Sequence, residues 1–254
     1  MTTTDDRQLI RALSVLSVPA PPELEGRIVA HWAYVEGPIV DVYVAFSPAG
    51  ISCVAPARSV RGDDGFIAAF RHDFGRPLVP ADVPPDGVED ALRSGRGGDL
   101  RFDLSTRTPF ERDVLNVALE IPPGEIRPYS WIAHQINRPR AVRAVGTALG
   151  HNPVPVLIPC HRVVRSDGDM GNYGFGRAMK RRLLDGEGVD VDLVGSMVRR
   201  GSNYVGDQVS RVVCMPTCHR LLTVPESHRH GFRWLADAGA VGYRPCEDCR
   251  PVGR

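Results

Sequence analysis

The sequence has 254 residues, of which 43% are hydrophobic and 24% are charged, and its formal net charge is +1 at pH 7. This length suits one large or two ordinary domains, and this composition excludes a disordered chain. No apolar run approaches the roughly 20 residues that span a bilayer, and the polar, acidic N-terminus is unlike a signal peptide. We therefore expect a cytoplasmic protein with reduced thiols and no membrane partner.

The charge is unevenly distributed along the chain. Residues 1–109 hold 11 basic and 15 acidic side chains, whereas residues 110–200 hold 13 basic and 10 acidic ones. A modest positive charge in the middle of the chain suits a phosphate-bearing partner.

The first 107 residues predict a small mixed α/β domain. A short apolar helical pattern covers residues 9–18, and residues 27–57 have the pattern of strands. A helix is expected over residues 64–72. Residues 76–99 are rich in Pro, Gly and Asp and are expected to form a loop with one short helix. No catalytic constellation is apparent in this part of the sequence.

Helical patterns begin at Thr108. Thr108-Pro109 provides an N-cap and a proline at the first helical position, and Pro122-Pro123-Gly124 ends that helix. Ser130 is a candidate cap for a second helix over residues 130–136, and a third helix is expected over residues 137–149. Three short helices with tight connections predict a helix-turn-helix core.

The third of these helices has an unusual exposed face. Arg140, Arg143 and Thr147 lie at i, i+3 and i+7 on one side. Ala144 and Gly146 flank them, so the helix backbone could approach a groove closely. The alternative is an ordinary amphipathic helix whose arginines are solvated.

A cysteine between a proline and a histidine follows an apolar run. Residues 154–158 (Val-Pro-Val-Leu-Ile) precede Pro159-Cys160-His161. A neighbouring His or Arg can lower the pKa of a thiol, and the thiolate is the reactive form. Cys160 is therefore a candidate nucleophile, and a buried structural cysteine is the alternative. The glycine-rich residues 171–176 lack the pattern of a nucleotide-binding P-loop.

Four of the six cysteines follow residues 195–203, which are rich in Gly, Ser and Arg and are expected to form a linker. They are arranged as Cys214-x3-Cys218 and Cys246-x2-Cys249, which is typical of a tetrathiolate zinc site. The segment that contains these four cysteines is too short to bury a large hydrophobic core, and segments of this size are usually stabilised by a bound metal or by disulfides. Two disulfides, a redox-active pair, or substitution of a ligand by one of three nearby histidines are the alternatives.

Six short stretches between residues 108 and 190 form a recognisable series. In chain order they are Tyr129-Ser130-Trp131, Arg143-Ala144-Val145-Gly146, Asn152-Pro153-Val154-Pro155, Ile158-Pro159-Cys160-His161-Arg162-Val163-Val164, Gly171-Asn172-Tyr173 and Glu187-Gly188. Together they resemble the catalytic domain of the O6-alkylguanine-DNA alkyltransferases, the methylated-DNA–protein-cysteine methyltransferases. The C-terminal Cys-x-Pro-x-Cys and Gly-Tyr-Arg-Pro-Cys-x-x-Cys patterns resemble the metal-binding module of the Ada adaptive-response protein.

The resemblance implies an α/β protein, which we expect to be a monomer, built from three domains. A ribonuclease H-like α/β domain is expected over residues 1–107. A helical winged helix-turn-helix alkyltransferase domain is expected over residues 108–194. After the linker, residues 195–203, a small tetra-cysteine zinc module is expected over residues 204–254.

The resemblance also implies a DNA-repair reaction that each molecule performs once. An alkyl group would pass from O6-alkylguanine, or from O4-alkylthymine, to Cys160, and no cofactor is expected for this transfer. His161 would act as a base through a bound water, and Glu187 would orient His161. Asn152 would brace the turn between the third helix and the active-site strand. Zinc, held by the four cysteines, is the implied cofactor of the C-terminal module.

The implied partner is double-stranded DNA in which the alkylated guanine is flipped out of the duplex. Arg143 would replace the extruded base, and Tyr129 would help to rotate the flanking phosphate. Ala144 and Gly146 would allow close docking to the minor groove. Arg140 is expected to be a further DNA contact.

Three residues are expected to shape the substrate pocket. Backbone groups at Val163 and Gly174 would read the guanine edge together with Cys160, and Tyr173 would form a wall. A protonated Tyr129 or the Gly174 amide would neutralise the leaving guanine. A non-catalytic lesion-binding protein is the alternative, and the presence of Cys160 argues against it.

The zinc module departs from the Ada arrangement. It lies at the C-terminal end of this chain, whereas Ada carries it at the N-terminus, and the araC-type regulatory region of Ada is missing. In Ada the first zinc-bound cysteine accepts a methyl group from DNA phosphotriesters, a role that would fall on Cys214 here. A structural zinc site with auxiliary DNA contact is the alternative.

Overall fold

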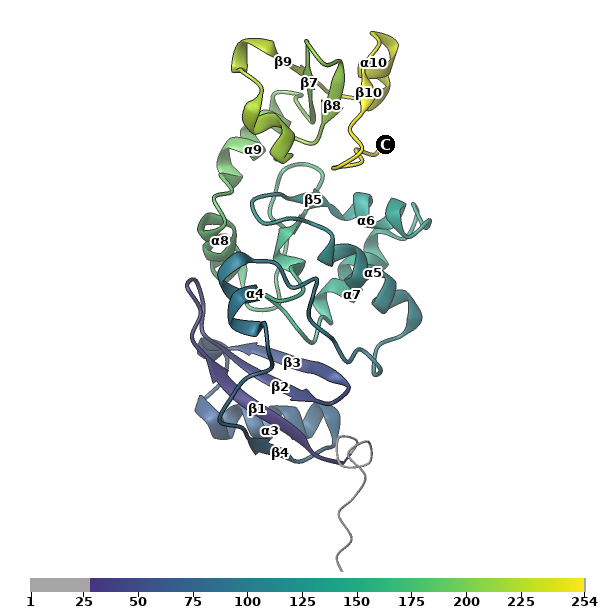
Figure 1. The fold of residues 1–254 in the computed structure, drawn as a ribbon. Coiled ribbons are helices and arrows are strands. Elements are labelled where there is room, and N and C mark those ends of the chain that lie inside the picture. Colours follow the sequence, from purple (N-terminus) through teal and green to yellow (C-terminus); the bar gives the residue numbers. More distant parts are fainter. Residues whose placement is uncertain (1–27, 254) are drawn as a thin grey trace, which may run out of the picture.

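The computed structural model describes residues 28–253, so the helix expected over residues 9–18 lies outside the described part of the chain. Three parts follow one another along an elongated molecule (Figure 1). An N-terminal sheet lies at one end, short helices occupy the middle, and a small C-terminal sheet lies at the other end. Within the described residues, no helix is long and apolar enough to cross a membrane.

The N-terminal sheet has the strand order β3-β2-β1-β4, with β1 and β4 parallel and the other pairs antiparallel. Its elements, with the helices that follow, are β1 (Ala30–Val35), β2 (Val42–Ser47), β3 (Gly50–Pro56), the 3-10 turn η1 (Ala57–Ser59), α3 (Gly62–Phe74), β4 (Leu78–Pro80) and α4 (Val88–Ser94). The strands expected within residues 27–57 and both expected helices are therefore present, and the short strand β4 is an addition.

This sheet is covered on both faces. Tyr43 and Ala45 of β2 pack in one cluster with Phe66 of α3. Val42 and Val44, on the opposite face of the same strand, belong to the large core that continues into the helical part. A strand buried on both faces has apolar residues at successive positions, as β2 does. The sheet therefore forms the base on which the helical part rests.

The helical part contains six helices or turns and one pair of short parallel strands. In chain order they are α5 (Pro109–Leu119), β5 (Arg127–Pro128), α6 (Tyr129–Gln135), α7 (Val142–Gly150), the 3-10 turn η2 (Cys160–Arg162), β6 (Val163–Val164), α8 (Arg177–Gly186) and α9 (Val191–Arg199). The cap expected at Thr108 is confirmed as a capping box. The Thr108 hydroxyl accepts the Glu111 N–H at 3.2 Å, and the Glu111 carboxylate accepts the Thr108 N–H at 2.9 Å.

Two predicted helix starts are wrong. Helix α6 begins at Tyr129 directly after Pro128, and Ser130 makes no cap. Helix α7 begins only at Val142, because the preceding residues form a turn in which the Ala141 N–H donates to the Arg138 carbonyl at 2.8 Å. Arg140 therefore precedes the helix instead of lying on its exposed face. The expected linker is also partly helical, since α9 extends to Arg199.

The C-terminal part is a four-stranded sheet in the order β10-β8-β7-β9. Its elements are β7 (Tyr204–Asp207), β8 (Val212–Cys214), the 3-10 turns η3 (His219–Thr223) and η4 (Glu226–His228), β9 (Arg229–Phe232), α10 (Leu235–Ala240) and β10 (Arg244–Pro245). Cys214 ends β8, and Cys246 directly follows β10. Because β8 and β10 run parallel and side by side, their ends bring the two cysteine pairs to the same edge.

Candidate active site and metal centre

Asn152 joins the thiol of Cys160 to the backbone of the segment that precedes it. Its Nδ2 donates to the Ile158 carbonyl at 3.0 Å and to Cys160 Sγ at 3.1 Å, while its Oδ1 accepts the Val154 N–H at 3.0 Å. Cys160 begins the turn η2 and is 7% exposed. The thiol is therefore fixed in position by one amide side chain.

The apolar run that precedes the thiol does not form the expected strand. Residues 154–158 form an irregular segment with a single bridge between Pro155 and Ile158, and Val156 has a φ of 75°. A β-branched residue rarely adopts this left-handed conformation, so surrounding contacts must maintain it. The N-terminal sheet supports the start of the segment, because the Val54 N–H donates to the Pro153 carbonyl at 2.8 Å.

His161 and Glu187 form a buried pair beside the thiol. His161 Nε2 lies 2.8 Å from Glu187 Oε1, and Arg162 donates Nε to Oε2 at 2.9 Å and Nη2 to Oε1 at 2.8 Å. Burial acts to raise the pKa of Glu187, but the hydrogen bonds from His161 and Arg162 more than offset it and hold the pKa at about 2. An ionised carboxylate only accepts hydrogen bonds, so the Nε2 of His161 is the donor.

The other ring nitrogen of His161 is therefore available as a base. In the described residues, buried Nδ1 has no hydrogen-bond partner. Burial lowers the pKa of His161, against the opposing effect of Glu187, so the ring is held in its neutral form. In this tautomer Nδ1 carries the lone pair.

Lys180, on α8, is a buried basic residue to which the sequence analysis assigned no role. Its Nζ donates to the carbonyls of Val163 at 2.5 Å and Met170 at 2.6 Å. Burial lowers the pKa of Lys180 to about 8. Burial raises the pKa of the Cys160 thiol, and the hydrogen bond from Asn152 and the charge of Lys180 oppose that rise. Lys180 is the only lysine of the chain, which is the one signal in the sequence that could have singled it out.

Arg162 is the second buried basic residue without a predicted role. Besides Glu187, it donates to the carbonyls of Ile121 and Gly95, both at 2.6 Å. Its guanidinium thus joins the turn after α5, the C-terminal end of α4 and the catalytic carboxylate candidate. No local pattern predicts these contacts, because they join residues 41 and 67 positions apart.

An open pocket of about 710 Å³ lies over the thiol. Six of the residues predicted to act in the site line it together: Tyr129, Arg143, Gly146, Cys160, Tyr173 and Gly174. Ala144 and Arg140 are exposed outside this lining, and Val163 is fully buried. Arg165 and Arg177 also line the pocket. Arg177 pairs with Asp169 of the same lining at 2.9 Å, so Arg143 and Arg165 supply the positive charge that is not balanced within the lining.

Two tyrosine hydroxyls of this pocket keep their protons. Burial, and then the neighbouring Cys160, raises the pKa of Tyr173 well above its ordinary value. The same two causes, in the same order, raise the pKa of Tyr129. Protonated phenols are hydrogen-bond donors, so both side chains could stabilise negative charge that develops on a bound base.

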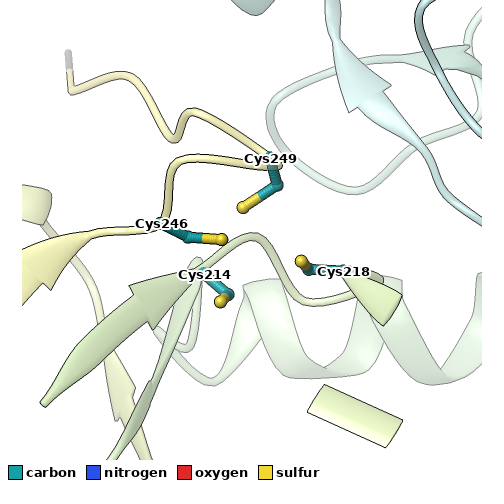
Figure 2. A group of neighbouring side chains, drawn as sticks. All are labelled: Cys214, Cys218, Cys246 and Cys249. Atoms are coloured by element: carbon teal, nitrogen blue, oxygen red, sulfur yellow. The ribbon is translucent and has the colours of Figure 1, made fainter. Parts of the chain in front are cut away.

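The four cysteines of the C-terminal part point their sulfur atoms toward one another (Figure 2). All four Sγ atoms lie within 4.8 Å of one another, and the thiols are buried and not joined by disulfides. A zinc tetrathiolate with Zn–S bonds of about 2.3 Å has sulfur atoms about 3.8 Å apart, so this cluster fits the ion. The Met215 N–H donates to Cys249 Sγ at 3.2 Å, as outer partners of metal-bound thiolates do.

The three histidines considered as substitute ligands do not join this cluster. His228 and His230 are exposed. His219 lies within 4.8 Å of Cys218 Sγ but outside the four-sulfur group, and its Nδ1 is 2.7 Å from Glu125 Oε1 in the helical part. The donor set therefore consists of sulfur alone.

Comparison with known families assigns two regions of the chain. The family described as "6-O-methylguanine DNA methyltransferase, DNA binding domain" matches residues 109–189, and the "Metal binding domain of Ada" matches residues 198–252.

Individual relatives agree with the first of these matches. A methylated-DNA–protein-cysteine methyltransferase of Methanothermobacter thermautotrophicus is 37% identical over 142 residues, which are 52% of this chain and 80% of that protein. One of Methanosarcina barkeri is 48% identical over 125 residues, or 44% and 79% of the two chains. The crystal structure of the Mycobacterium tuberculosis O6-methylguanine methyltransferase superposes with a TM-score of 0.51 at 32% identity, covering 62% of this chain and 92% of that one. The chain therefore belongs to the methylated-DNA–protein-cysteine methyltransferase family and carries an Ada-type metal-binding domain.

Proposed function

We propose that this chain repairs DNA by moving one alkyl group from the O6 atom of guanine, or the O4 atom of thymine, to its own Cys160. The observation that carries the proposal is a single thiol in an open pocket, bonded to Asn152 and adjacent in sequence to the buried His161–Glu187 pair. A thiolate suits this reaction because soft, polarisable sulfur attacks saturated carbon well. The S–C bond forms as the C–O6 bond breaks, and the guanine anion takes its proton from the Tyr129 phenol, which solvent water then reprotonates.

The proton released by Cys160 passes to His161 Nδ1 through a bound water. This assignment is supported by the lone pair at Nδ1 and by its lack of a partner among the described residues. Glu187 stays ionised, holds the ring by Nε2–H and stabilises the imidazolium that forms. The positive charge of Lys180 favours the thiolate over the thiol. No step restores the thiol from the thioether product, so each molecule reacts once.

DNA binds over the pocket with the alkylated base turned out of the duplex. Arg143 and Tyr129 line the pocket. Arg143 replaces the extruded base in the stack, and Tyr129 contacts the rotated phosphate. Gly146 lies in the same lining, and Ala144 is an exposed small residue on the same helix, so the DNA can approach α7 closely. Arg140, in the turn before α7, contacts the backbone phosphates.

The guanine edge is read by backbone groups at Cys160 and Gly174, which line the pocket, together with the backbone of the buried Val163. Tyr173 forms the wall beside the thiol, and its retained proton suits contact with the leaving oxygen. Gly174 lines the pocket, and even an added Cβ there would meet nothing within 4 Å, which leaves space for alkyl groups larger than methyl.

We propose three domains, of which the second contains the first family match and the third contains most of the second match. Residues 1–107 form a ribonuclease H-like domain, and residues 108–194 form the winged helix-turn-helix alkyltransferase domain. Residues 195–203 join them to a zinc module over residues 204–254. We further expect a cytoplasmic monomer.

The C-terminal module holds zinc through Cys214, Cys218, Cys246 and Cys249. Cys214 is a candidate second methyl acceptor, because it lines a surface pocket of about 340 Å³ together with His219 and Arg220. Two basic side chains beside a thiolate suit a phosphate-bearing methyl donor. Without methyl transfer, the same surface provides auxiliary contact to DNA.

Mass mapping of all six cysteines tests both roles. After incubation with a duplex that contains one O6-methylguanine, the Cys160 peptide gains the mass of one methylene unit, once per molecule, and the Cys160→Ala variant gains none. An adduct that persists elsewhere in Cys160→Ala refutes Cys160 as the acceptor. With a duplex that contains methyl phosphotriesters, an adduct on Cys214 supports its role as a second methyl acceptor. If Cys214 stays unmodified, its role is that of a structural zinc ligand.

A further inference from the structure

The loops that carry the metal-binding cysteines also contact the helical part. Thr217, next to Cys218, exchanges two hydrogen bonds with Ile126. The Ile126 N–H donates to Thr217 Oγ1 at 2.9 Å, and the Thr217 hydroxyl donates to the Ile126 carbonyl at 3.3 Å. The carbonyl of Cys249 accepts the indole N–H of Trp131 at 2.9 Å. Both halves of the cysteine cluster are therefore bonded to the segment 125–131.

A buried carboxylate lies at the centre of this contact. The side chain of Glu125 is 3% exposed. Its Oε1 accepts the backbone N–H of His219 at 3.0 Å and lies 2.7 Å from His219 Nδ1, while its Oε2 pairs with Arg127. A buried charge requires such partners, because desolvation disfavours it otherwise. Glu125 thus joins the residue after Cys218 to strand β5.

Strand β5 continues directly to the thiol pocket. Arg127 and Pro128 pair in parallel register with Val163 and Val164, the residues that follow the turn η2. The next residue after β5 is Tyr129, which lines the pocket. A displacement of residues 125–127 would therefore reach Tyr129 along the chain and the residues that follow η2 through the pairing of β5 with β6.

We propose that Glu125 is a positioning residue for alkyl transfer, which fixes β5 and Tyr129 against the metal-binding loop of the C-terminal part. The inference rests on the proposed function of the Cys160 pocket. The zinc-bound cluster completes the scaffold of this pocket, because the ion holds the loops of Thr217 and Cys249 in the geometry that contacts residues 125–131. Release of the ion frees these loops, and the segment loses the partners that order it.

The test compares the full chain loaded with zinc and the same chain stripped by a chelator. Hydrogen exchange of the amides of residues 125–131 measures the order of the segment. A single-turnover reaction with an O6-methylguanine duplex measures the rate of alkyl transfer. Stripping the zinc is expected to speed exchange in residues 125–131 and to slow alkyl transfer, each by about tenfold, and zinc re-addition is expected to reverse both.

Variants separate positioning from general stability. Glu125→Gln and Thr217→Val, loaded with zinc, should show the fast exchange and slow transfer of the stripped wild type, and added zinc should not rescue them. The matched control is Thr223→Val, whose hydroxyl bonds to the Arg220 carbonyl within the turn η3. It should behave as the wild type. If Glu125→Gln does not fold, Thr217→Val alone tests the contact.

Two results overturn the proposal. One is unchanged exchange of residues 125–131 after zinc removal, and the other is a normal transfer rate in zinc-loaded Glu125→Gln or in zinc-loaded Thr217→Val. If the proposed function itself is wrong, the zinc-loaded wild type shows no methyl adduct on Cys160. The exchange measurement then still decides whether the metal orders residues 125–131.

Discussion

Replacement of Glu187 by glutamine tests the electrostatics of the buried catalytic pair. Glutamine keeps the shape of the side chain and one carbonyl acceptor but removes the charge that His161 and Arg162 share. The pKa of Glu187 is about 2 in the folded protein, against an ordinary value of 4.5. The difference between these pKa values corresponds to about 3 kcal/mol of folding free energy at neutral pH.

The pH dependence follows from the direction of this change. Because the folded protein binds the proton of Glu187 more weakly than the unfolded chain does, the stabilisation is fully present above a pH of about 4.5. It is lost as the pH falls toward 2, and about 1 kcal/mol remains at pH 3. Glu187→Gln should therefore be less stable than the wild type by about 3 kcal/mol at pH 7 and by clearly less at pH 3.

Urea unfolding at both pH values measures this difference. Release of zinc in acid affects both proteins and cancels in the comparison. The matched control is Glu247→Gln, because the Glu247 side chain is 87% exposed and lies 4.0 Å from Arg244. It should stay within about 0.5 kcal/mol of the wild type at either pH. An equal loss of stability for Glu187→Gln at pH 7 and pH 3 would show that packing, and not the ionised carboxylate, stabilises the pair.

Three further predictions concern the pocket and the first helix of the middle part. Lys180→Met should slow the reaction of Cys160 with iodoacetamide at pH 7 by about tenfold, because loss of the ammonium charge raises the pKa of the thiol by about one unit. Relative to that variant, wild-type stability should rise between pH 8 and 10.5, because the pKa of Lys180 is about 8 when folded and 10.5 ordinarily, so the unfolded chain binds more protons there. A stability difference between the two proteins that does not change between pH 8 and 10.5 contradicts this. Arg143→Ala should slow alkyl transfer from duplex DNA by about tenfold, or about 1.4 kcal/mol, but leave the iodoacetamide rate unchanged. Thr108→Ala should cost about 1 kcal/mol in urea unfolding, and Thr106→Ala, outside the capping box, should cost much less.

The sequence predicts those features whose causes are local. Thr108-Pro109 and Glu111 lie within one helical turn, so their capping box is visible in the order of residues. The spacing of the cysteine pairs likewise predicts a four-sulfur cluster, and the strands β8 and β10 bring the pairs together. The Ser130 cap fails because Pro128 already ends the extended segment and α6 starts one residue earlier than expected.

The features that the sequence does not predict depend on distant parts of the chain. Lys180 lies on an amphipathic helix among arginines, and only the fold shows that two backbone carbonyls bind its ammonium in the interior. The segment before Cys160 is apolar enough for a strand, but the side-chain bonds of Asn152 hold it in an irregular conformation instead. Glu125 is one acidic residue among many until the C-terminal part covers it.

The bond from Arg162 to the carbonyl of Gly95 has a consequence for shortened versions of this protein. Among residues 28–253, every one that lines the thiol pocket follows Thr108, so a fragment starting there keeps this lining. That fragment nevertheless lacks Gly95, whose φ of 68° and close approach to the Arg162 guanidinium leave no space for a side chain. The guanidinium that holds Glu187 would lose one of its two backbone acceptors. A fragment that reacts at the full rate must therefore include Gly95, although every reactive side chain comes later in the chain.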